Sequence, residues 1–316
     1  MIYSESFGKH SSKILLGTAY FGSNIPEEIA FSIMDRFVEL GGNHIDTARM
    51  YSDGESEKIV AKWQKSRNNK DVFVSTKGGF PYSETPDVSR ISENEIRIDI
   101  EESLKALQTE TIDFYWLHRD DETIPAGEII ETMNKLVKEG KIKRFGASNW
   151  RSYRIRSAND YAKENALMGF EASQIRFSPA VTAPSGNADQ TLVEMTEDEF
   201  RFYKANNLPV AAYASQAKGF FSKMAISGKD GLSDKAKERY LCSENLSKFE
   251  YIMKLSEKYE CSVASIVCGS LCSINKPNIF PIIGGRTVGQ IEDSMCGADL
   301  ALEAAELREL FGYSID

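Results

Sequence analysis

The sequence predicts one α/β domain spanning residues 1–316, folded as a (β/α)8 TIM barrel. Short apolar strand candidates alternate with helical patterns along the chain, which is typical of parallel strands joined by crossover helices. Eight such units within about 300 residues match the usual size of a closed barrel. The G-x-G-x-x-G pattern that follows the first strand of a doubly wound dinucleotide-binding sheet occurs nowhere in the chain. A closed barrel is therefore favoured over an open sheet.

The expected strands are short runs rich in Val, Ile, Leu and aromatic residues. They lie at residues 13–17, 44–47, 72–76, 112–117, 144–147, 170–175, 209–213 and 279–283. Runs such as VFVST and FPIIGG are apolar without alternation, which is typical of strands buried on both faces.

The first expected helix begins near Asn24, whose side chain can cap the free amides, with Pro26 in the first turn and Gly41 at the end. Apolar residues at helical spacing predict its inward face, which carries Ile29, Ile33, Phe37 and Leu40.

Two later helices show equally local signals. Ser92 followed by Glu95 predicts a capping box at the start of the third helix. The buried stripe of that helix is expected to be Ile96, Ile100, Leu104 and Leu107. The fourth helix, at 125–140, is expected to turn inward Ile129, Met133, Leu136 and Val137.

The chain is longer than eight minimal units require, and most of the extra length lies between the seventh and eighth strands. Residues 219–234 are expected to form a loop there, followed by helices near 246–259 and 262–274. The first dozen residues are expected to form a hairpin that closes the bottom of the barrel, and the last helical pattern covers 300–310.

Composition excludes several classes of protein. There are 38 Lys+Arg against 47 Asp+Glu, a net charge of −9, and no dense basic block, so we expect no nucleic-acid partner. No apolar run approaches the roughly 18 residues of a membrane span, so we expect a cytoplasmic protein without a membrane partner. The five cysteines lack the spacing of metal ligands, so we expect no metal site and small buried thiols in a reducing compartment.

Ionisable side chains end three successive expected strands. Asp46 ends the second strand with Tyr51 close behind it, Lys77 ends the third, and His118 ends the fourth. Barrel enzymes gather their chemistry at these carboxyl ends. An ammonium group ending a buried strand costs free energy unless it is paired, and Asp46 on the neighbouring strand is the natural partner of Lys77.

The motifs around these residues resemble the aldo-keto reductase superfamily, and the stretch YASQAKGFF and the run 118–121 (HRDD) resemble a bacterial branch of it. The segments HIDTARMYSDGESE, FVSTKGG, IDFYWLHRDD, GKIKRFGASNW and PIIGGRTVGQIEDS occur in the order of that family, from about Lys13 to Leu310. The resemblance implies an NADP(H)-dependent oxidoreductase that reduces aldehyde or ketone carbonyls to alcohols. It also implies a catalytic tetrad of Asp46, Tyr51, Lys77 and His118.

The chemistry of carbonyl reduction needs each of these residue types. Tyr51 is the expected proton donor. A free phenol has a pKa near 10, and the positive charge of Lys77 beside Tyr51 is expected to lower that value by roughly 1–3 units. Asp46 is expected to keep Lys77 charged, and His118 to orient the carbonyl oxygen by a hydrogen bond.

The resemblance also implies the cofactor site. Ser148, Asn149 and Gln174 match positions that hold the nicotinamide carboxamide, and Tyr213 matches the aromatic residue that stacks on its ring. Arg286 has a planar fork suited to the 2′-phosphate, which favours NADP over NAD. The remaining positions expected along the cofactor are Gly17, Thr18, Asp46, Ser215, Gln216, Gly219, Gly284, Gln290 and Asp293. Ser294 departs from the Asn that relatives often carry after the acidic residue.

Loops at the strand ends are expected to form the substrate pocket, whose aromatic walls suit sugars or apolar carbonyls. The residues expected to ring it are Tyr20, Phe21, Phe80, Tyr82, Arg119 and Trp150. Arg119 either pairs with an anionic group of the substrate or is neutralised by Asp120 or Asp121. Little sequence follows the last helical pattern, so the pocket is expected to be open or completed by a neighbouring subunit of a homo-oligomer.

Two alternatives use the same residues. Lys77 as a Schiff-base nucleophile would need a neutral amine, which a nearby Asp46 disfavours. The family also includes cytoplasmic subunits of potassium channels, so the chain can instead be a nicotinamide-binding regulatory subunit with very slow turnover. The tetrad by itself does not separate that role from a reductase.

Overall fold

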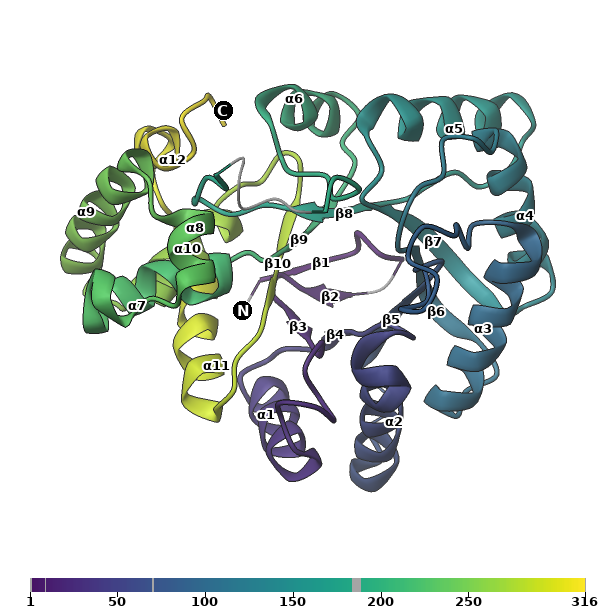
Figure 1. The fold of residues 1–316 in the computed structure, drawn as a ribbon, viewed down its shortest axis with the longest axis horizontal. Helices are drawn as coiled ribbons and strands as arrows, with labels where there is room; N and C mark the ends of the chain where they lie inside the picture. Colours follow the sequence, from purple (N-terminus) through teal and green to yellow (C-terminus); the bar gives the residue numbers. More distant parts are fainter. Residues whose placement is uncertain (1, 9, 70, 184–188, 316) are drawn as a thin grey trace.

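The computed structural model describes residues 2–8, 10–69, 71–183 and 189–315. In this part of the chain, eight parallel strands close into a barrel in the order β10-β3-β4-β5-β6-β7-β8-β9 (Figure 1). The strands are β3 Leu15–Gly17, β4 His44–Asp46, β5 Phe73–Gly78, β6 Ile112–Leu117, β7 Ile142–Ser148, β8 Ser173–Arg176, β9 Val210–Tyr213 and β10 Ile279–Ile283. The predicted closed barrel is confirmed.

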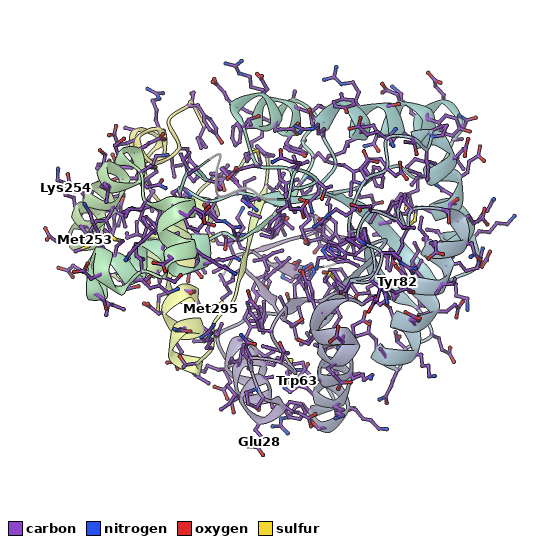
Figure 2. The ribbon with its side chains drawn as sticks, in the orientation of Figure 1. Glu28, Trp63, Tyr82, Met253, Lys254 and Met295 are labelled. Carbon is purple, nitrogen blue, oxygen red and sulfur yellow. The ribbon has the colours of Figure 1, made fainter. Side chains whose placement is uncertain are left out.

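Helices surround the barrel, and their apolar side chains form the outer core together with those of the strands. They are α1 Glu27–Glu39, α2 Glu55–Arg67, α3 Glu93–Leu107, α4 Ala126–Lys138, α5 Ser152–Glu164, α6 Glu197–Ala205, α7 Phe220–Ser227, α8 Asp234–Tyr240, α9 Ser243–Lys258, α10 Val263–Cys272, α11 Val288–Met295 and α12 Ala304–Phe311. Trp63 is buried and lies between α1 and α2, whereas Glu28 and Lys254 project outward (Figure 2).

A short antiparallel hairpin of β1 Tyr3–Ser4 and β2 Ser11–Ser12 lies in the middle of the ring of strands (Figure 1). Between its strands, Phe7 is only 1% exposed and its ring packs edge-on against Phe114 and Phe280. An inner apolar cluster forms around it from Leu15, Phe73, Phe114, Trp116, Ala172, Ala211 and Phe280. The N-terminal hairpin expected from the sequence is present, and Phe7 fills the interior of the barrel at that end.

The start of α1 differs from the expectation. Asn24 does not cap the helix: Pro26 is its N-cap residue, and no side chain caps there. Ile29 is 42% exposed instead of inward. The buried face is Ala30, Ile33, Met34 and Phe37, so the stripe is rotated by one position from the predicted one. The helix docks on its neighbours along the face that fills space best, and a short apolar pattern leaves this rotation open.

The expected box at α3 is half formed. Ser92 accepts a hydrogen bond from the Glu95 amide, as predicted. The Glu95 carboxylate pairs with Arg90. The predicted buried stripes of α3 and α4 are confirmed except at Val137, which is only partly buried.

The region 219–234 is not a loop. It contains α7, the start of α8 and the short 3-10 helix η4 Lys229–Gly231. Phe220, Phe221 and Met224 are buried on α7, so this helix is anchored by apolar contacts. Eight residues are too few for a periodic pattern to be separated from a loop in the sequence.

We expect Phe7→Ala to destabilise the barrel by about 3–5 kcal/mol, because a buried aromatic ring is replaced by a cavity. Urea unfolding followed by circular dichroism measures this change. The matched control is Ile226→Ala, since Ile226 is 82% exposed and should change the free energy of unfolding little. Equal stability of the Phe7→Ala variant and the native chain would show that the hairpin does not seal the barrel.

Candidate active site

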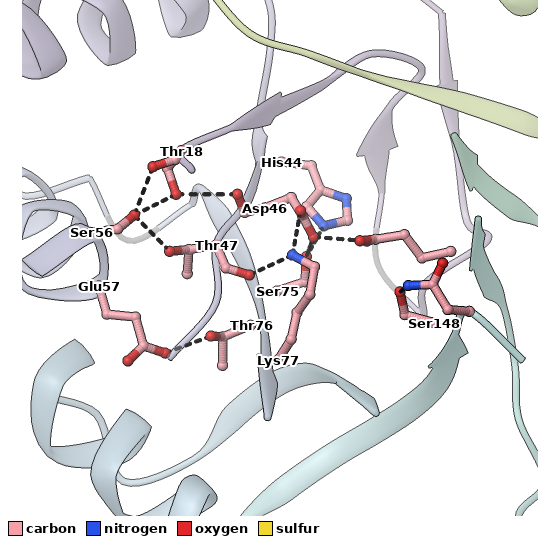
Figure 3. A network of polar contacts seen from close by, with 12 residues as sticks. Thr18, His44, Asp46, Thr47, Ser56, Glu57, Ser75, Thr76, Lys77 and Ser148 are labelled. Carbon is pink, nitrogen blue, oxygen red and sulfur yellow. Dashed lines mark hydrogen bonds and ion pairs between the residues drawn. The ribbon is translucent and has the colours of Figure 1, made fainter. Parts of the chain in front are cut away.

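The carboxyl ends of β4 and β5 bring a buried ion pair to one end of the barrel. Lys77 Nζ donates to Asp46 Oδ2 at 2.5 Å and to the Thr47 carbonyl oxygen at 2.6 Å. The side chains of Lys77 and Asp46 are 0% and 3% exposed. Figure 3 shows Lys77 reaching toward both acceptors. Tyr51, in the 3-10 helix η1 Tyr51–Gly54, places its ring centre 4.9 Å from Lys77 Nζ.

The second oxygen of Asp46 is held by other strands. Asp46 Oδ1 accepts from Ser75 Oγ at 3.1 Å and from Gln174 Nε2 at 3.0 Å. Ser75 Oγ also lies 3.0 Å from His44 Nε2, and His44 Nδ1 lies 2.9 Å from Ser11 Oγ in the hairpin. A buried hydrogen-bonded chain therefore connects the closed end of the barrel with the ion pair.

Sequence reasoning missed Ser75 and His44. Both lie two residues before a predicted site residue, Lys77 and Asp46 respectively. Since side chains in a strand alternate with a period of two, each shares the barrel-facing side with the predicted site residue that follows it. Polar residues at that spacing are the signal that identifies them.

The pair keeps Lys77 positively charged. Burial by itself lowers the pKa of Lys77, but the Asp46 carboxylate and Tyr51 together raise it above its ordinary value. A charged ammonium at this position opposes the Schiff-base alternative, which needs a neutral amine.

Tyr51 departs from its expected acidity. Burial raises the pKa of the Tyr51 phenol, and the opposing charge of Lys77 does not overcome that effect. Lys77 does lower the pKa as predicted, but burial outweighs it, so the expected net value below the ordinary pKa is wrong. At neutral pH the Tyr51 hydroxyl carries its proton, which is the form that an acid catalyst needs.

His118 is held uncharged. Burial, followed by the positive charges of Lys77, Arg119 and Arg49, lowers the pKa of His118 well below its ordinary value. Its ring centre lies 6.0 Å from that of Tyr51 and 5.0 Å from that of Phe80. Within the described residues, no partner satisfies the buried Nδ1 atom of His118. A neutral imidazole has one N–H, so this ring can donate a hydrogen bond to an oxygen between Tyr51 and His118.

The end of β3 closes tightly on β4. The Thr18 amide donates to the Asp46 carbonyl oxygen at 3.1 Å, and Thr18 Oγ1 lies 2.7 Å from Ser56 Oγ. A side chain at Gly17 would come within 2.9 Å of Ile282. Ser56, which sequence reasoning missed, also lies 3.0 Å from Thr47 Oγ1, and this hydroxyl cluster fixes the backbone around Asp46 (Figure 3).

Polar side chains from β7 to β9 continue this rim. Ser148 and Asn149 lie at the end of β7, with Gln174 paired opposite Ser148 on β8. Asn149 has a left-handed φ of 59°. Its Oδ1 accepts from the Tyr213 hydroxyl at 2.7 Å and from the Val193 amide at 3.1 Å. The four predicted residues of this group are therefore adjacent, and Tyr213 is held through its hydroxyl with its ring half-buried.

The residues after β9 reach toward α11. Ser215 is buried and donates to the Ile282 carbonyl oxygen at 2.7 Å. Gln216 Nε2 donates to Ser294 Oγ at 2.9 Å, while Gly219 precedes α7 with a φ of 76°. Ser294 is 3% exposed on α11 and bonds to Gln216, so it links this helix to the segment after β9.

The segment after β10 is open to solvent and could bind an anion. Thr287 caps α11 by accepting from the Gln290 amide at 3.3 Å, and Gln290 Oε1 accepts from the Arg286 amide at 2.7 Å. Arg286 is exposed, and no carboxylate of the described chain pairs with its guanidinium. Space is open around Gly284, while Asp293 lies half-buried on α11. This donor set fits a phosphate-bearing ligand.

Of the residues expected around the substrate, two are wrong. Phe21 is 1% exposed and packs in the outer core, while Trp150 is fully buried. The Trp150 indole N–H donates to the Arg119 carbonyl oxygen at 3.0 Å, and its ring packs on Phe170 at 4.8 Å. Both follow strands, as pocket residues do, but the structure places both in the outer hydrophobic core instead.

Phe80 and Arg119 do lie beside His118, and the Arg119 Cζ atom is 4.6 Å from the Phe80 ring centre. Tyr20 is 50% exposed on the loop after β3. Tyr82 is partly exposed and stacks on Arg90, whose Cζ atom lies 3.8 Å from the ring centre.

Arg119 is neutralised by neither of its expected partners. Its Nη2 donates to Asp189 Oδ2 at 3.0 Å. Asp120 instead accepts two hydrogen bonds from Arg154, both at 2.9 Å. Asp121 accepts from Thr123.

Among the residues with described coordinates, no cluster of three or more His, Cys, Asp and Glu side chains could hold a metal ion. Within the same residues, no helix has the length and apolar character needed to cross a membrane.

Comparisons with known proteins agree with this geometry. The model of the Aldo/keto reductase family matches residues 13–312. Norsolorinic acid reductase B of Dothistroma septosporum is 29% identical over 318 residues, covering 95% of this chain and 77% of that protein. The uncharacterized oxidoreductase YrpG of Bacillus subtilis is 30% identical over 323 residues, covering 98% and 94%. An aldo-keto reductase from Klebsiella pneumoniae, solved with NADPH, shares the fold with a TM-score of 0.71, 23% identity and coverage of 98% and 94%.

We expect the neutrality of His118 to make stability depend on pH. The folded chain keeps this ring unprotonated, whereas the unfolded chain protonates it below its ordinary pKa of about 6.5. The contribution of the neutral His118 ring to the free energy of unfolding is complete above that pH. It falls as the pH falls, and the loss reaches about 1.4 kcal/mol near pH 5.5. Urea unfolding at about pH 8 and pH 5.5 measures it.

His118→Gln should lose this part of the pH dependence, because glutamine does not titrate. His10→Gln, which changes an exposed histidine, should keep it. An identical pH dependence in the His118→Gln variant and the native chain would contradict a depressed pKa at His118.

Proposed function

Because the chain belongs to the aldo/keto reductase family, we propose that it is an NADP(H)-dependent enzyme that reduces aldehyde or ketone carbonyls, including those of sugars, to alcohols. The observation that carries this proposal is the buried Lys77–Asp46 pair beside Tyr51 and opposite an uncharged His118. Relatives named as a reductase and as an oxidoreductase support it, as does the NADPH bound to the Klebsiella pneumoniae structure.

Bound NADPH would supply the hydride for this reaction. Ser148, Asn149 and Gln174 would hold the carboxamide, and Tyr213 would cover the nicotinamide ring. The residues that would hold the rest of the cofactor are Gly17, Thr18, Asp46, Ser215, Gln216, Gly219, Gly284, Arg286, Gln290 and Asp293. Arg286 would bind the 2′-phosphate, since its exposed guanidinium has no carboxylate partner in the described chain.

Tyr51 would donate the proton that the reduced carbonyl oxygen needs. Lys77 lies beside the phenol and stabilises the phenolate that remains after proton transfer. Asp46 keeps Lys77 charged and, through its bonds to Ser75 and Gln174, fixes where the ammonium points.

His118 would orient the substrate. As an uncharged ring it can donate one hydrogen bond to the carbonyl oxygen without competing with Tyr51 as a proton source. In the reverse reaction the same geometry lets Tyr51 act as the base.

Titration with NADPH and NADH, followed by a panel of small aldehydes, tests the whole proposal. Quenching of protein fluorescence reports binding, and loss of dihydronicotinamide absorbance reports turnover. Tighter binding of NADPH with aldehyde-dependent oxidation supports the reductase. Absence of binding to either nucleotide would refute it, and tight binding without turnover would favour the regulatory role.

Tyr51→Phe is expected to lower the rate of aldehyde reduction by at least about 100-fold, because the ring remains but its proton is removed. NADPH affinity should stay within about threefold of the native value, since the lost hydroxyl is not a proposed cofactor ligand. Steady-state kinetics and fluorescence titration measure the two quantities. A variant that kept most of its reductase rate would show that another group is the proton donor.

Arg286→Met is expected to weaken NADPH binding by about 10- to 100-fold, the typical effect of losing a charge-assisted contact to phosphate. NADH, which lacks the 2′-phosphate, should bind nearly as before. The control is Lys254→Met, which removes an exposed cation on α9, outside the segment after β10. Equal losses for the two nucleotides would contradict the assignment of Arg286 to the 2′-phosphate.

A further inference from the structure

Arg119 is positioned by its own surroundings at the edge of the tetrad. Its backbone carbonyl accepts from the buried Trp150 indole, and its Nη1 donates to the His118 carbonyl oxygen at 2.9 Å. Its guanidinium stacks on Phe80, whose ring in turn packs beside that of His118. The side chain is only 11% exposed. A cation is therefore held next to the residue that faces the reacting carbonyl.

The charge of the Arg119 guanidinium affects three other residues of the site. Its charge works to lower the pKa of Tyr51, His118 and Tyr213, against the burial that acts on each of them. These three residues follow or end different strands, β4, β6 and β9, so the charge of Arg119 reaches groups from three strand ends.

Among the described residues, Asp189 is the carboxylate that pairs with Arg119, and the pairing is weak. Asp189 touches Arg119 through Oδ2 alone, at 3.0 Å, and its side chain is 44% exposed. Its other oxygen accepts from the amide and hydroxyl of Thr191, at 2.9 and 2.5 Å. Asp189 can therefore keep its place in its own loop after it releases Arg119.

An arginine of this kind has unused binding capacity. A guanidinium can bind a carboxylate by two parallel N–H···O bonds, and Asp189 uses one N–H. Partly exposed ion pairs contribute little to stability, so displacing Asp189 costs little. A single positive charge matches a single negative charge, and the group that occupies Arg119 in this structure is a carboxylate.

We propose that Arg119 is a specificity-determining residue that binds a carboxylate on the substrate, so that the chain favours aldehydes carrying a carboxylate group. Asp189 occupies Arg119 in the absence of such a substrate and competes with it. This inference rests on the proposed carbonyl reduction for the reaction that it directs.

The carboxylate takes no part in the electron transfer. Bound NADPH would supply the hydride to the carbonyl carbon and would leave as NADP+. Tyr51 would give its proton to the carbonyl oxygen as the π bond opens, which would yield a primary alcohol, and solvent would reprotonate Tyr51.

The test compares 4-formylbenzoate with its neutral methyl ester. The measured quantity is the ratio of kcat/KM for the acid to kcat/KM for the ester, compared between each variant and the native chain. This comparison cancels the different intrinsic reactivities of the two aldehydes. Arg119→Met is expected to lower the ratio by about 10- to 100-fold, and Arg119→Lys by less, since lysine keeps the charge without the fork.

Asp189→Asn is expected to change the ratio in the opposite direction. Removing the competing carboxylate should raise it by about three- to fivefold, mainly through a lower KM for the acid. Asp198→Asn is the matched control, because it neutralises a carboxylate that is 94% exposed on α6. That control should leave the ratio unchanged.

A binding measurement separates failure of this inference from failure of the proposed function. Calorimetry with benzoate and benzamide, in the presence and absence of NADP+, needs no turnover. Benzoate should bind Asp189→Asn more tightly than the native chain and Arg119→Met more weakly, with benzamide unaffected. Absence of turnover with this binding pattern would refute the reductase alone. Ratios and benzoate affinities that do not change in either Arg119 or Asp189 variants would overturn the carboxylate site.

Discussion

The buried ion pair between Lys77 and Asp46 is the constraint on which the rest of the site depends. An ammonium that is fully shielded from water is unstable unless a carboxylate and further acceptors surround it. The Thr47 carbonyl supplies another acceptor, while Ser75 and Gln174 hold the second oxygen of Asp46. Donors and acceptors from β4, β5 and β8 thus converge on one pair, so the register of these strands and the direction of the ammonium are determined together.

The opposite end of the barrel contributes to the same pair. Phe7 fills the interior there and keeps water out, which strengthens every electrostatic interaction above it. His44 packs against Phe7 and continues the hydrogen-bonded chain to Ser75. At the other end, burial of their own side chains raises the pKa of Tyr51 and lowers that of His118. Both rings are therefore uncharged at neutral pH, and Lys77 is the charged member beside them.

The charged side chains at the edge of the site, unlike the Lys77–Asp46 pair, are exposed or weakly paired. Arg286 is exposed without a carboxylate partner in the described chain, and Arg119 is paired with a carboxylate that is itself nearly half exposed. Such groups are solvated or weakly paired, so a ligand can replace their surroundings at low cost. The interior pair, in contrast, cannot exchange its partners without leaving a buried charge. This difference separates the part of the site suited to catalysis from the parts suited to recognition.

The sequence by itself determined the barrel, the approximate positions of its strands, and the residue types at the strand ends, including Asp46, Tyr51, Lys77 and His118. These features are local, because strand periodicity and the cost of a buried charge are visible in short segments. Only the tertiary structure decided the inward face of α1, the helix in 219–234, the burial of Phe21 and Trp150, the pairing of Arg119 with Asp189 and the acidity of Tyr51. Each of these depends on residues far apart in the chain. Burial and electric field are set by all the neighbours that the fold brings together, and no short segment of sequence specifies them.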